Sequence, residues 1–316
     1  MTAAANTQRL VGDVGGTNCR FAMTDVGAEG ALIDPRGFER EGYDTLEAAI
    51  DHYLDGRPRP AEAVIAVAGP VTDGRADLTN GRWKMSDSAL VACGFKRARL
   101  INDYEALALS VRRLRPADLA DIGDVRARRG TVAIIGAGTG LGVGALVRDA
   151  MGETVAVTEG GHIAFAPTDE TEVAILGILT ARFGRVSVER LLSGPGLVNI
   201  YEALARLDGI EALDLSPEDV VHRAAHGEDR QCVQALDRFC RIYGAVAGDF
   251  ALAFGATGGV YLGGGIAPRL IDTLRKSGFR QAFEAKGRFR DYCSAIPTKI
   301  ILHPHAALLG AAAAAI

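Results

Sequence analysis

Short apolar runs bounded by turn residues recur along the chain, and each predicts a buried β-strand. These runs are 9–14, 19–26, 61–71, 98–103, 131–138, 143–149, 154–161, 258–265 and 298–304. Between them, apolar residues recur at helical spacing, as Leu46, Ile50, Tyr53 and Leu54 do within 45–54. Further helices are predicted at 86–95, 104–114, 171–183, 197–207, 216–226, 232–254, 267–279 and 305–315.

The helix at 216–226 carries its own start signal, since Ser216 suits the N-cap and Pro217 the first helical position. Strands that alternate with helices are typical of an α/β protein with largely internal sheets. There is also a faint internal repeat, because 13–22 and 136–145 are both strand–glycine loop–strand units roughly 120 residues apart. Two similar halves that face each other would form one cleft.

Three glycine turns each follow an apolar strand: DVGGTN at 13–18, GAGTGLG at 136–142 and LGGGI at 262–266. Glycine allows a backbone to approach a ligand closely and to present several N–H groups to an anion. Thr17 and Thr139 add hydroxyl donors, and Asp13 is an acid beside which a hydrated Mg²⁺ would sit. Any single turn could be only a hairpin, but three of this kind favour a phosphate site.

Other phosphate motifs fit the chain poorly. No GxxxxGK[ST] segment occurs. Gly140 to Ala145 matches a dinucleotide fingerprint formally, but that fingerprint must open a helix, and here a predicted strand follows.

Composition narrows the class of protein. The chain has 316 residues, 48% of them hydrophobic, a net charge of −4 and a sequence pI of about 5.9, which describe a globular protein without the basic footprint of a nucleic-acid binder. The five cysteines are odd in number and lack CxxC spacing, which fits a reducing compartment. No signal peptide is recognisable, and the apolar tail at 306–316 is shorter than the roughly 20 residues that cross a bilayer. We expect a cytoplasmic enzyme or regulator with no membrane partner.

Two further pairs of residues carry candidate chemistry. Asn102 and Asp103 end a strand directly before a helix, where ligands bind in open α/β sheets. Asp103 could be a general base, or either residue could simply cap the helix. Glu159 and His162 flank two glycines and could bind a metal, act as an acid–base pair or hold a hydroxyl-rich ligand. Gly160 and Gly161 come after the apparent strand TVAVT (154–158), which argues against the helical Glu-x-x-His of di-iron sites.

Six segments in this order resemble the bacterial glucokinase family, within the actin–hexokinase superfamily and its ribonuclease H-like halves. They are DVGGTN (13–18), LINDYEA (100–106), GAGTGLG (136–142), TEGGH (158–162), VERLLSGPGLVNIY (188–201) and YLGGGI (261–266). The resemblance implies a two-lobed α/β fold with a central cleft, a small domain of 1–112 plus 303–316 and a large domain of 113–302. It implies transfer of the γ-phosphoryl of ATP to the 6-hydroxyl of glucose with Mg²⁺, the entry step of glycolysis, in a homodimer.

The resemblance also assigns roles. Asp103 matches the catalytic base, and the sugar ligands match Asn102, Glu159, His162 and Glu189. Gly69, Asn80 and Gly81 match a loop that closes over the sugar. The nucleotide-binding positions match Asp13, Gly15, Gly16, Thr17, Asn18, Gly138, Thr139, Gly140, Gly264 and Gly265. In this context Glu159 and His162 are interpreted as a polyol clamp, since both can pair with adjacent hydroxyls.

Departures from related families are informative. The similar ROK kinases and repressors carry a cysteine-rich zinc segment after a GH, whereas 161–179 holds no cysteine, so no structural zinc is expected. Separately, no residue is expected to ligate a metal directly, and Asp13 could contact Mg²⁺ through water. Few residues precede the first strand, which argues against a helix-turn-helix repressor.

Three alternatives stay open at this point. The first is the same reaction on mannose, N-acetylglucosamine or fructose. The second is a sugar sensor without activity, which an intact Asp103 disfavours, and the third is an actin-like ATPase, which the carboxylate-rich sugar motifs disfavour. The sequence leaves ADP and polyphosphate open as donors in place of ATP.

Overall fold

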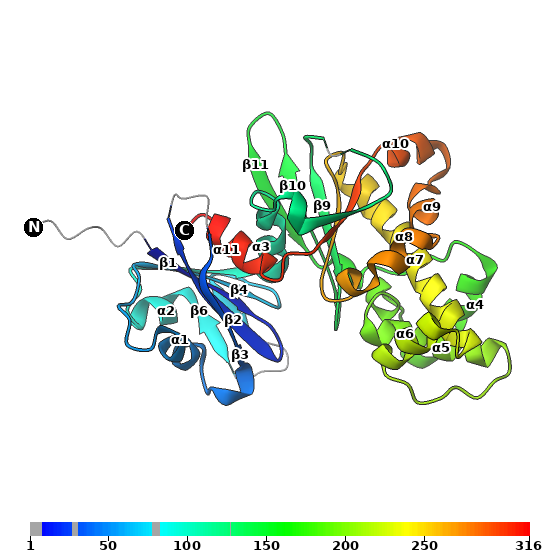
Figure 1. The fold of residues 1–316 in the computed structure, drawn as a ribbon, viewed down its shortest axis with the longest axis horizontal. Coiled ribbons are helices and arrows are strands. Elements are labelled where there is room, and N and C mark those ends of the chain that lie inside the picture. The colour runs from blue at the N-terminus through cyan, green and yellow to red at the C-terminus, as the bar shows by residue number, and fades with distance from the viewer. Residues whose placement is uncertain (1–7, 27–30, 78–82, 127) are drawn as a thin grey trace, which may run out of the picture. The chain divides into compact units, whose positions relative to one another are not determined.

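The computed structural model describes residues 8–26, 31–77, 83–126 and 128–316, and the chain divides into two compact units (Figure 1). The first unit combines Met1–Asp118 with His303–Ile316, and the second is Leu119–Leu302. The first unit therefore consists of two segments that lie far apart in the sequence.

The first unit is built on a five-stranded sheet with the order β3-β2-β1-β4-β7. The strands β1, β4 and β7 are parallel, and β2 and β3 are added antiparallel to them. Their bounds are β1 Gln8–Val14, β2 Asn18–Asp25, β3 Ile33–Glu39, β4 Glu62–Val67 and β7 Arg97–Asn102, and a small ribbon is formed by β5 Arg75–Asp77 and β6 Lys84–Ser86.

Both faces of this sheet are covered by helices, which explains why β4 is buried at every position and β1 at most of its positions. On one face Leu10, Phe21 and Ile65 pack with α1 (Leu46–Leu54) and α2 (Asp87–Ala92). On the other face lie α3 (Asp103–Ser110) and α11 (Ala306–Ala313), which pack on each other and on the strands. The two helices are so close that a Cβ at Gly310 would lie 1.6 Å from the carbonyl oxygen of Ala106.

The second unit repeats the strand arrangement of the first. Its sheet has the order β11-β10-β9-β12-β13-β8, in which β9, β12 and β13 are parallel, β10 and β11 continue antiparallel from β9, and β8 is an extra antiparallel edge. The bounds are β8 Leu119–Ile122, β9 Val132–Ala137, β10 Leu141–Arg148, β11 Glu153–Thr158, β12 Gly259–Gly263 and β13 Thr298–Ile301. The glycine turns β1–β2 and β9–β10 thus occupy equivalent positions in the two sheets.

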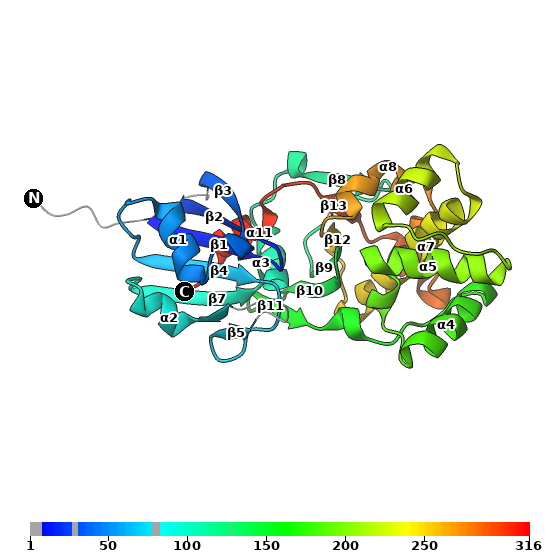
Figure 2. The ribbon, with the colours of Figure 1, turned by 90° about the horizontal axis from the view of Figure 1, so that it is seen from below.

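Helices form the rest of the second unit, with α7 at the centre of its core (Figure 2). Their bounds are α4 Glu170–Phe183, α5 Gly194–Leu207, α6 Pro217–His226, α7 Arg230–Phe254, α8 Ile271–Lys276, α9 Phe279–Glu284 and α10 Arg290–Ser294. Tyr243 of α7 is fully buried and donates its hydroxyl hydrogen to the carbonyl of Ile135, 3.2 Å away, which ties α7 to β9. Gly244 lets α9 approach, because a Cβ there would lie 2.0 Å from the carbonyl oxygen of Phe279.

Short 3₁₀ helices connect these elements: η1 Arg40–Gly42, η2 Pro116–Asp118, η3 Gly160–His162, η4 Val188–Arg190, η5 Ala267–Leu270 and η6 Gly287–Phe289. The predicted N-cap Ser216 is confirmed and forms a reciprocal capping box with Asp219. The single helix predicted at 267–279 is wrong, since the segment is η5 followed by α8, and Phe279 already begins α9. Among the described residues no helix is both long and apolar enough to span a membrane.

Candidate active site

In the first unit, the ends of three parallel strands bring predicted site residues to one edge of the sheet. Val14 is in register with Val67, and Val67 with Asn102, so β1, β4 and β7 end together. The first glycine turn, Gly15 to Asn18, follows β1 and is closed by a hydrogen bond from the Gly15 N–H to the Asn18 carbonyl (2.8 Å). This edge is where an open α/β sheet binds its ligand.

Asp13 lies near the end of β1 and contributes a carboxylate to this edge. Its carboxylate forms an ion pair with Arg20, its cross-strand neighbour on β2, at 3.2 Å. Burial raises the pKa of Asp13, and the Arg20 guanidinium opposes that rise. Sequence reasoning missed Arg20, although pairing residues outward from the turn at 15–18 puts positions 13 and 20 opposite each other.

Asn102 holds the junction between β7 and α3. Its Oδ1 accepts from the backbone N–H groups of Tyr104 (2.9 Å) and Glu105 (3.3 Å), and its Nδ2 donates to the carbonyl of Gly69 (2.9 Å). Asn102 is therefore the N-cap, and Asp103 is the first residue of the helix. The Asp103 Oδ1 also accepts from the Tyr104 N–H (3.1 Å), so its carboxylate takes part in the start of the helix beside the cap that Asn102 supplies.

In the second unit, the two other glycine turns lie side by side. The turn at Gly138 and Gly140 closes β9 and β10, and Gly264 and Gly265 follow β12. Gly264 has a φ of +75°, and a Cβ there would lie 2.4 Å from the carbonyl oxygen of Ala137. Only glycine fits this close approach, which brings the two turns into contact.

The predicted sugar ligands of the second unit form a cluster beside the turn at 138–140. His162 Nε2 lies 4.0 Å from a carboxylate oxygen of Glu159, and His162 Nδ1 lies 3.9 Å from Glu189 Oε1. These separations are longer than hydrogen bonds, so the polar atoms keep capacity for a ligand. The side chains of Glu159 and His162 are more than half exposed, and that of Glu189 is 31% exposed.

The two glycines between Glu159 and His162 have a packing reason. They form η3, which lies against β10. A Cβ at Gly161 would lie 1.9 Å from the carbonyl oxygen of Leu141, and one at Gly160 would lie 2.9 Å from the Phe250 and Val143 side chains. Glycine therefore lets the chain turn tightly on β10 so that both flanking side chains project from the turn.

Glu189 connects this cluster to the glycine turn. Its Oε2 accepts from the backbone N–H of Leu141 (2.9 Å), and a Cβ at Gly140 would lie 2.6 Å from the same oxygen. The other oxygen is the one that faces His162. The link between positions 48 residues apart was not visible in the sequence, because it depends on how η4 packs against the second sheet.

The remaining predicted positions belong to the loop that is expected to close over the sugar. Gly69 is held by Asn102, with a φ of +144°. Asn80 and Gly81 lie outside the described residues.

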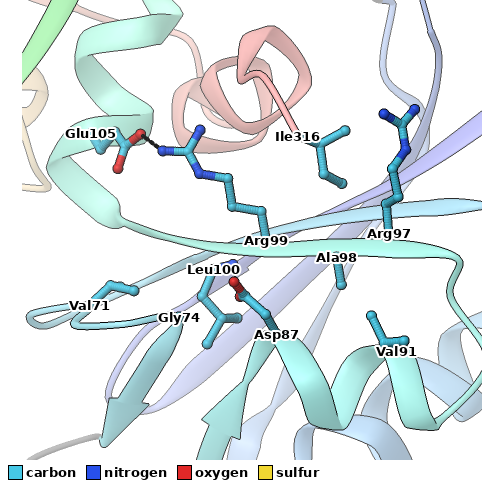
Figure 3. Close-up of a pocket in the computed structure, with 10 residues that line it drawn as sticks. All are labelled: Val71, Gly74, Asp87, Val91, Arg97, Ala98, Arg99, Leu100, Glu105 and Ile316. Carbon is cyan, nitrogen blue, oxygen red and sulfur yellow. Dashed lines mark hydrogen bonds and ion pairs between the residues drawn. The ribbon is translucent and has the colours of Figure 1, made fainter.

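A pocket of about 540 Å³ in the first unit involves none of the predicted site residues (Figure 3). It lies along β7, and its two arginines are already paired. Arg99 contacts Glu105 at 2.7 Å, as the dashed line in Figure 3 shows, and Arg97 is paired with Glu62. This pocket therefore offers no unpaired positive charge for an anionic ligand.

Comparison with known proteins supplies the family. The chain matches the family described as Glucokinase over residues 10–316. It is 50% identical over 310 residues to a glucokinase of Caulobacter sp. (strain K31), an alignment that covers 96% of this chain and 94% of that protein. The chain belongs to the glucokinase family.

Solved glucokinases share the fold. A glucokinase from an Antarctic psychrotroph is 36% identical, with a TM-score of 0.90 over 97% of this chain and 98% of that one. A Balamuthia mandrillaris glucokinase, solved in complex with glucose, is 19% identical, with a TM-score of 0.78 over 97% and 92%. The predicted actin–hexokinase type of α/β fold is confirmed by these glucokinase structures.

Proposed function

We propose that this chain is a glucokinase that transfers the γ-phosphoryl group of ATP to the 6-hydroxyl of glucose, giving glucose 6-phosphate and ADP. One observation carries the proposal. Glu159, His162 and Glu189 form a polar cluster, and Glu189 is hydrogen-bonded directly to the glycine turn. A group of residues suited to a polyol thus adjoins a turn suited to a phosphate.

The cluster would hold the sugar through its hydroxyls. Each carboxylate oxygen accepts hydrogen bonds, and a neutral imidazole has one donor and one acceptor. A hydroxyl donates and accepts at once, so adjacent hydroxyls of a pyranose can satisfy both types. Asn102 would add the amide hydrogen that its contact with Gly69 does not use.

The glycine turns would bind the nucleotide phosphates through backbone N–H groups. In this assignment Gly15, Gly16, Thr17 and Asn18 form the first phosphate turn, and Gly138, Thr139 and Gly140 the second. Gly264 and Gly265 lie on the nucleotide side. Support comes from the contact between the turn at 138–140 and the turn at 264–265. Two adjacent turns can direct several N–H donors toward one anion.

Asp103 would act as general base on the sugar hydroxyl. Direct phosphoryl transfer asks the protein mainly to position its substrates and to stabilise charge, and no covalent intermediate is implied. The carboxylate takes the proton as the oxygen attacks.

The residues present fit a magnesium ion held with the nucleotide. Mg²⁺ keeps several waters and takes one or two carboxylates together with substrate phosphates. Asp13 offers a single carboxylate, already paired with Arg20, which suits a contact through water better than direct ligation. When bound, the ion would offset phosphate charge.

The deciding experiment is phosphorylation of a sugar panel by purified protein with ATP and Mg²⁺. We expect glucose to be phosphorylated with the highest kcat/KM among glucose, mannose, fructose and N-acetylglucosamine. Preference for another sugar would leave the chemistry in place and change the substrate. Absence of sugar-dependent ATP consumption on all four sugars would contradict the proposal, and substituting ADP or polyphosphate for ATP tests the donor.

The family resemblance also leads us to propose a cytoplasmic homodimer that acts at the entry of glycolysis. Sedimentation of the purified protein would give twice the mass of one chain. A monomer at micromolar concentration would contradict the dimer without affecting the proposed reaction.

A further inference from the structure

Two histidines and a glutamate form a cluster on the surface of the second unit. His222 and His226 lie four residues apart on α6 and therefore on one face, and Glu228 follows the helix. One ligand atom from each side chain lies within 4.8 Å of the other two, and all three residues are exposed. Among the residues that the structure describes, no other His, Cys, Asp or Glu residues form such a group of three.

The backbone around Glu228 is fixed from both sides. The Glu228 N–H donates to the carbonyl of Arg223 (3.0 Å), and the Gly227 N–H to that of Ala224 (3.2 Å), which is a Schellman motif with Gly227 at a φ of +66°. The next residue, Asp229, caps α7 by accepting from two backbone N–H groups. The turn between α6 and α7 (Figure 2) therefore holds Glu228 next to the last turn of α6 without help from a ligand.

A hydrogen bond also orients one of the imidazoles. His226 Nδ1 lies 2.8 Å from the carbonyl oxygen of His222, and a carbonyl can only accept. Nδ1 must therefore carry the hydrogen, which leaves the lone pair of a neutral ring on Nε2. Metal-bound histidines commonly have this arrangement, with the second ring nitrogen donating to a backbone carbonyl. The two ring centroids are only 4.3 Å apart.

We propose that His222, His226 and Glu228 bind a divalent transition-metal ion, with zinc as the best match. Two imidazoles and one carboxylate suit Zn²⁺, Ni²⁺, Co²⁺ or Cu²⁺, whereas Mg²⁺ prefers oxygen ligands alone. Zinc lies about 2.0–2.2 Å from such ligands, so the three atoms must draw closer together than they are here. Because all three side chains are exposed, they can rotate to do so, and water would complete the coordination.

The protein would not need the bound metal ion in order to fold. The first turn of α6 is closed by the Ser216–Asp219 capping box and its last turn by the Schellman motif. The inference is separate from the expectation that the chain needs no structural zinc. It is also separate from the proposed kinase reaction, since none of the three residues has a role there.

The test is a calorimetric titration of the full-length, nucleotide-free protein with zinc chloride, repeated with Co²⁺ while its visible absorption is followed. We expect one zinc per chain. Loss of an outer-shell partner typically lowers metal affinity about 10–100-fold, so the loss of a ligand in His222→Ala, His226→Ala or Glu228→Gln should weaken binding at least tenfold. The matched control is His52→Gln, which removes an exposed histidine of the first unit and should leave zinc affinity unchanged.

Thermal unfolding gives an independent measurement. An ion that binds only the native protein raises its melting temperature, so zinc should raise that of the wild type and of His52→Gln but not that of His226→Ala. Equal melting temperatures without zinc would show that the variants fold normally. The proposal is overturned if the wild type shows no saturable binding at millimolar zinc, or if the three cluster variants keep wild-type affinity, which would assign the ion to other residues.

Discussion

Individual residues of the candidate site were predictable where a local motif defines them. The pairs at 102–103 and 159–162 stand out in the sequence because polar residues directly follow predicted strands. Glu189 was identified only through the family resemblance, and its contact with Leu141 could not be predicted at all. That contact depends on the tertiary packing of η4, which no local pattern encodes.

Asp103 is the residue for which the prediction is most direct. Asp103→Asn keeps the size and the helix start but cannot take a proton, so kcat should fall by about 10²–10⁴ while glucose binding persists. Steady-state kinetics and glucose titration measure the two effects. Retention of more than about a tenth of wild-type kcat would show that Asp103 has no role as a base.

A matched control for this substitution is Asp229→Asn. Asp229 caps α7, and asparagine is as good an N-cap as aspartate. We expect wild-type kcat in this variant, so that any large loss in Asp103→Asn cannot be attributed to the start of a helix.

Replacement of Glu159 or Glu189 should weaken glucose binding, but only replacement of Glu189 should also affect ATP. Removing a charged hydrogen-bond acceptor costs about 1.5–3 kcal/mol, so Glu159→Ala and Glu189→Ala should each weaken glucose binding roughly 10–150-fold. Glu189→Ala should also raise the KM for ATP, because the Leu141 N–H loses its acceptor beside the turn at 138–140. Glu189→Gln keeps an oxygen for that N–H and should spare the KM for ATP. An unchanged glucose affinity in both alanine variants would remove the cluster from the sugar site.

At the scale of elements, the sequence predicts strands and helices best where they are buried on one regular face. It missed β3, whose segment IDPRGFE contains proline and glycine at the edge of the sheet, and β8, a short edge strand. The sequence also predicted a single helix over 267–279, because the apolar spacing continues through Ser277 and Gly278. The break between α8 and α9 at these two residues depends on tertiary contacts. Edges and breaks carry little periodic signal.

The contact between α11 and α3 gives a prediction about stability. Gly310→Ala would put a methyl group 1.6 Å from the Ala106 carbonyl oxygen, so one of the two helices must move. Overpacking of this kind typically costs about 1–3 kcal/mol and sometimes more. We expect a fall in the free energy of unfolding at the upper end of that range, measured by urea denaturation.

The control is Gly177→Ala in the middle of α4. Apart from its chain neighbours and the backbone of α4 itself, no atom lies within 4 Å of the position that its Cβ would take, and the residue is exposed. Alanine should stabilise the helix there by about 0.5–1 kcal/mol relative to glycine. A destabilised Gly177→Ala would mean that glycine replacement is harmful for a reason other than close packing.

At the scale of the whole molecule, the repeated glycine motif indicated two related sheets, and both sheets have a hairpin joined to parallel strands in the same order. The helical content of the second unit could be predicted, but its packing around α7 could not. That packing depends on glycines such as Gly244, whose role becomes visible only when α9 lies against them.

Removal of metal tests the proposed reaction on the intact protein. Chelation of Mg²⁺ should abolish sugar phosphorylation, because the nucleotide loses its counter-charge, and added Mg²⁺ should restore it. The far-UV circular dichroism spectrum should stay the same throughout, since no metal is needed for folding. Unfolding by the chelator, or full activity in its presence, would contradict this expectation.

The two-segment composition of the first unit has a consequence for biosynthesis. On the ribosome, β1, β2, β4, β7 and α3 are made early, whereas α11 is made only after the whole of Leu119–Leu302. At about 5–20 residues per second that interval lasts roughly 10–40 s. During this time the sheet face that α11 covers is without its helix, so the nascent chain is an expected client for chaperones. The first unit is completed only when α11 has left the ribosome.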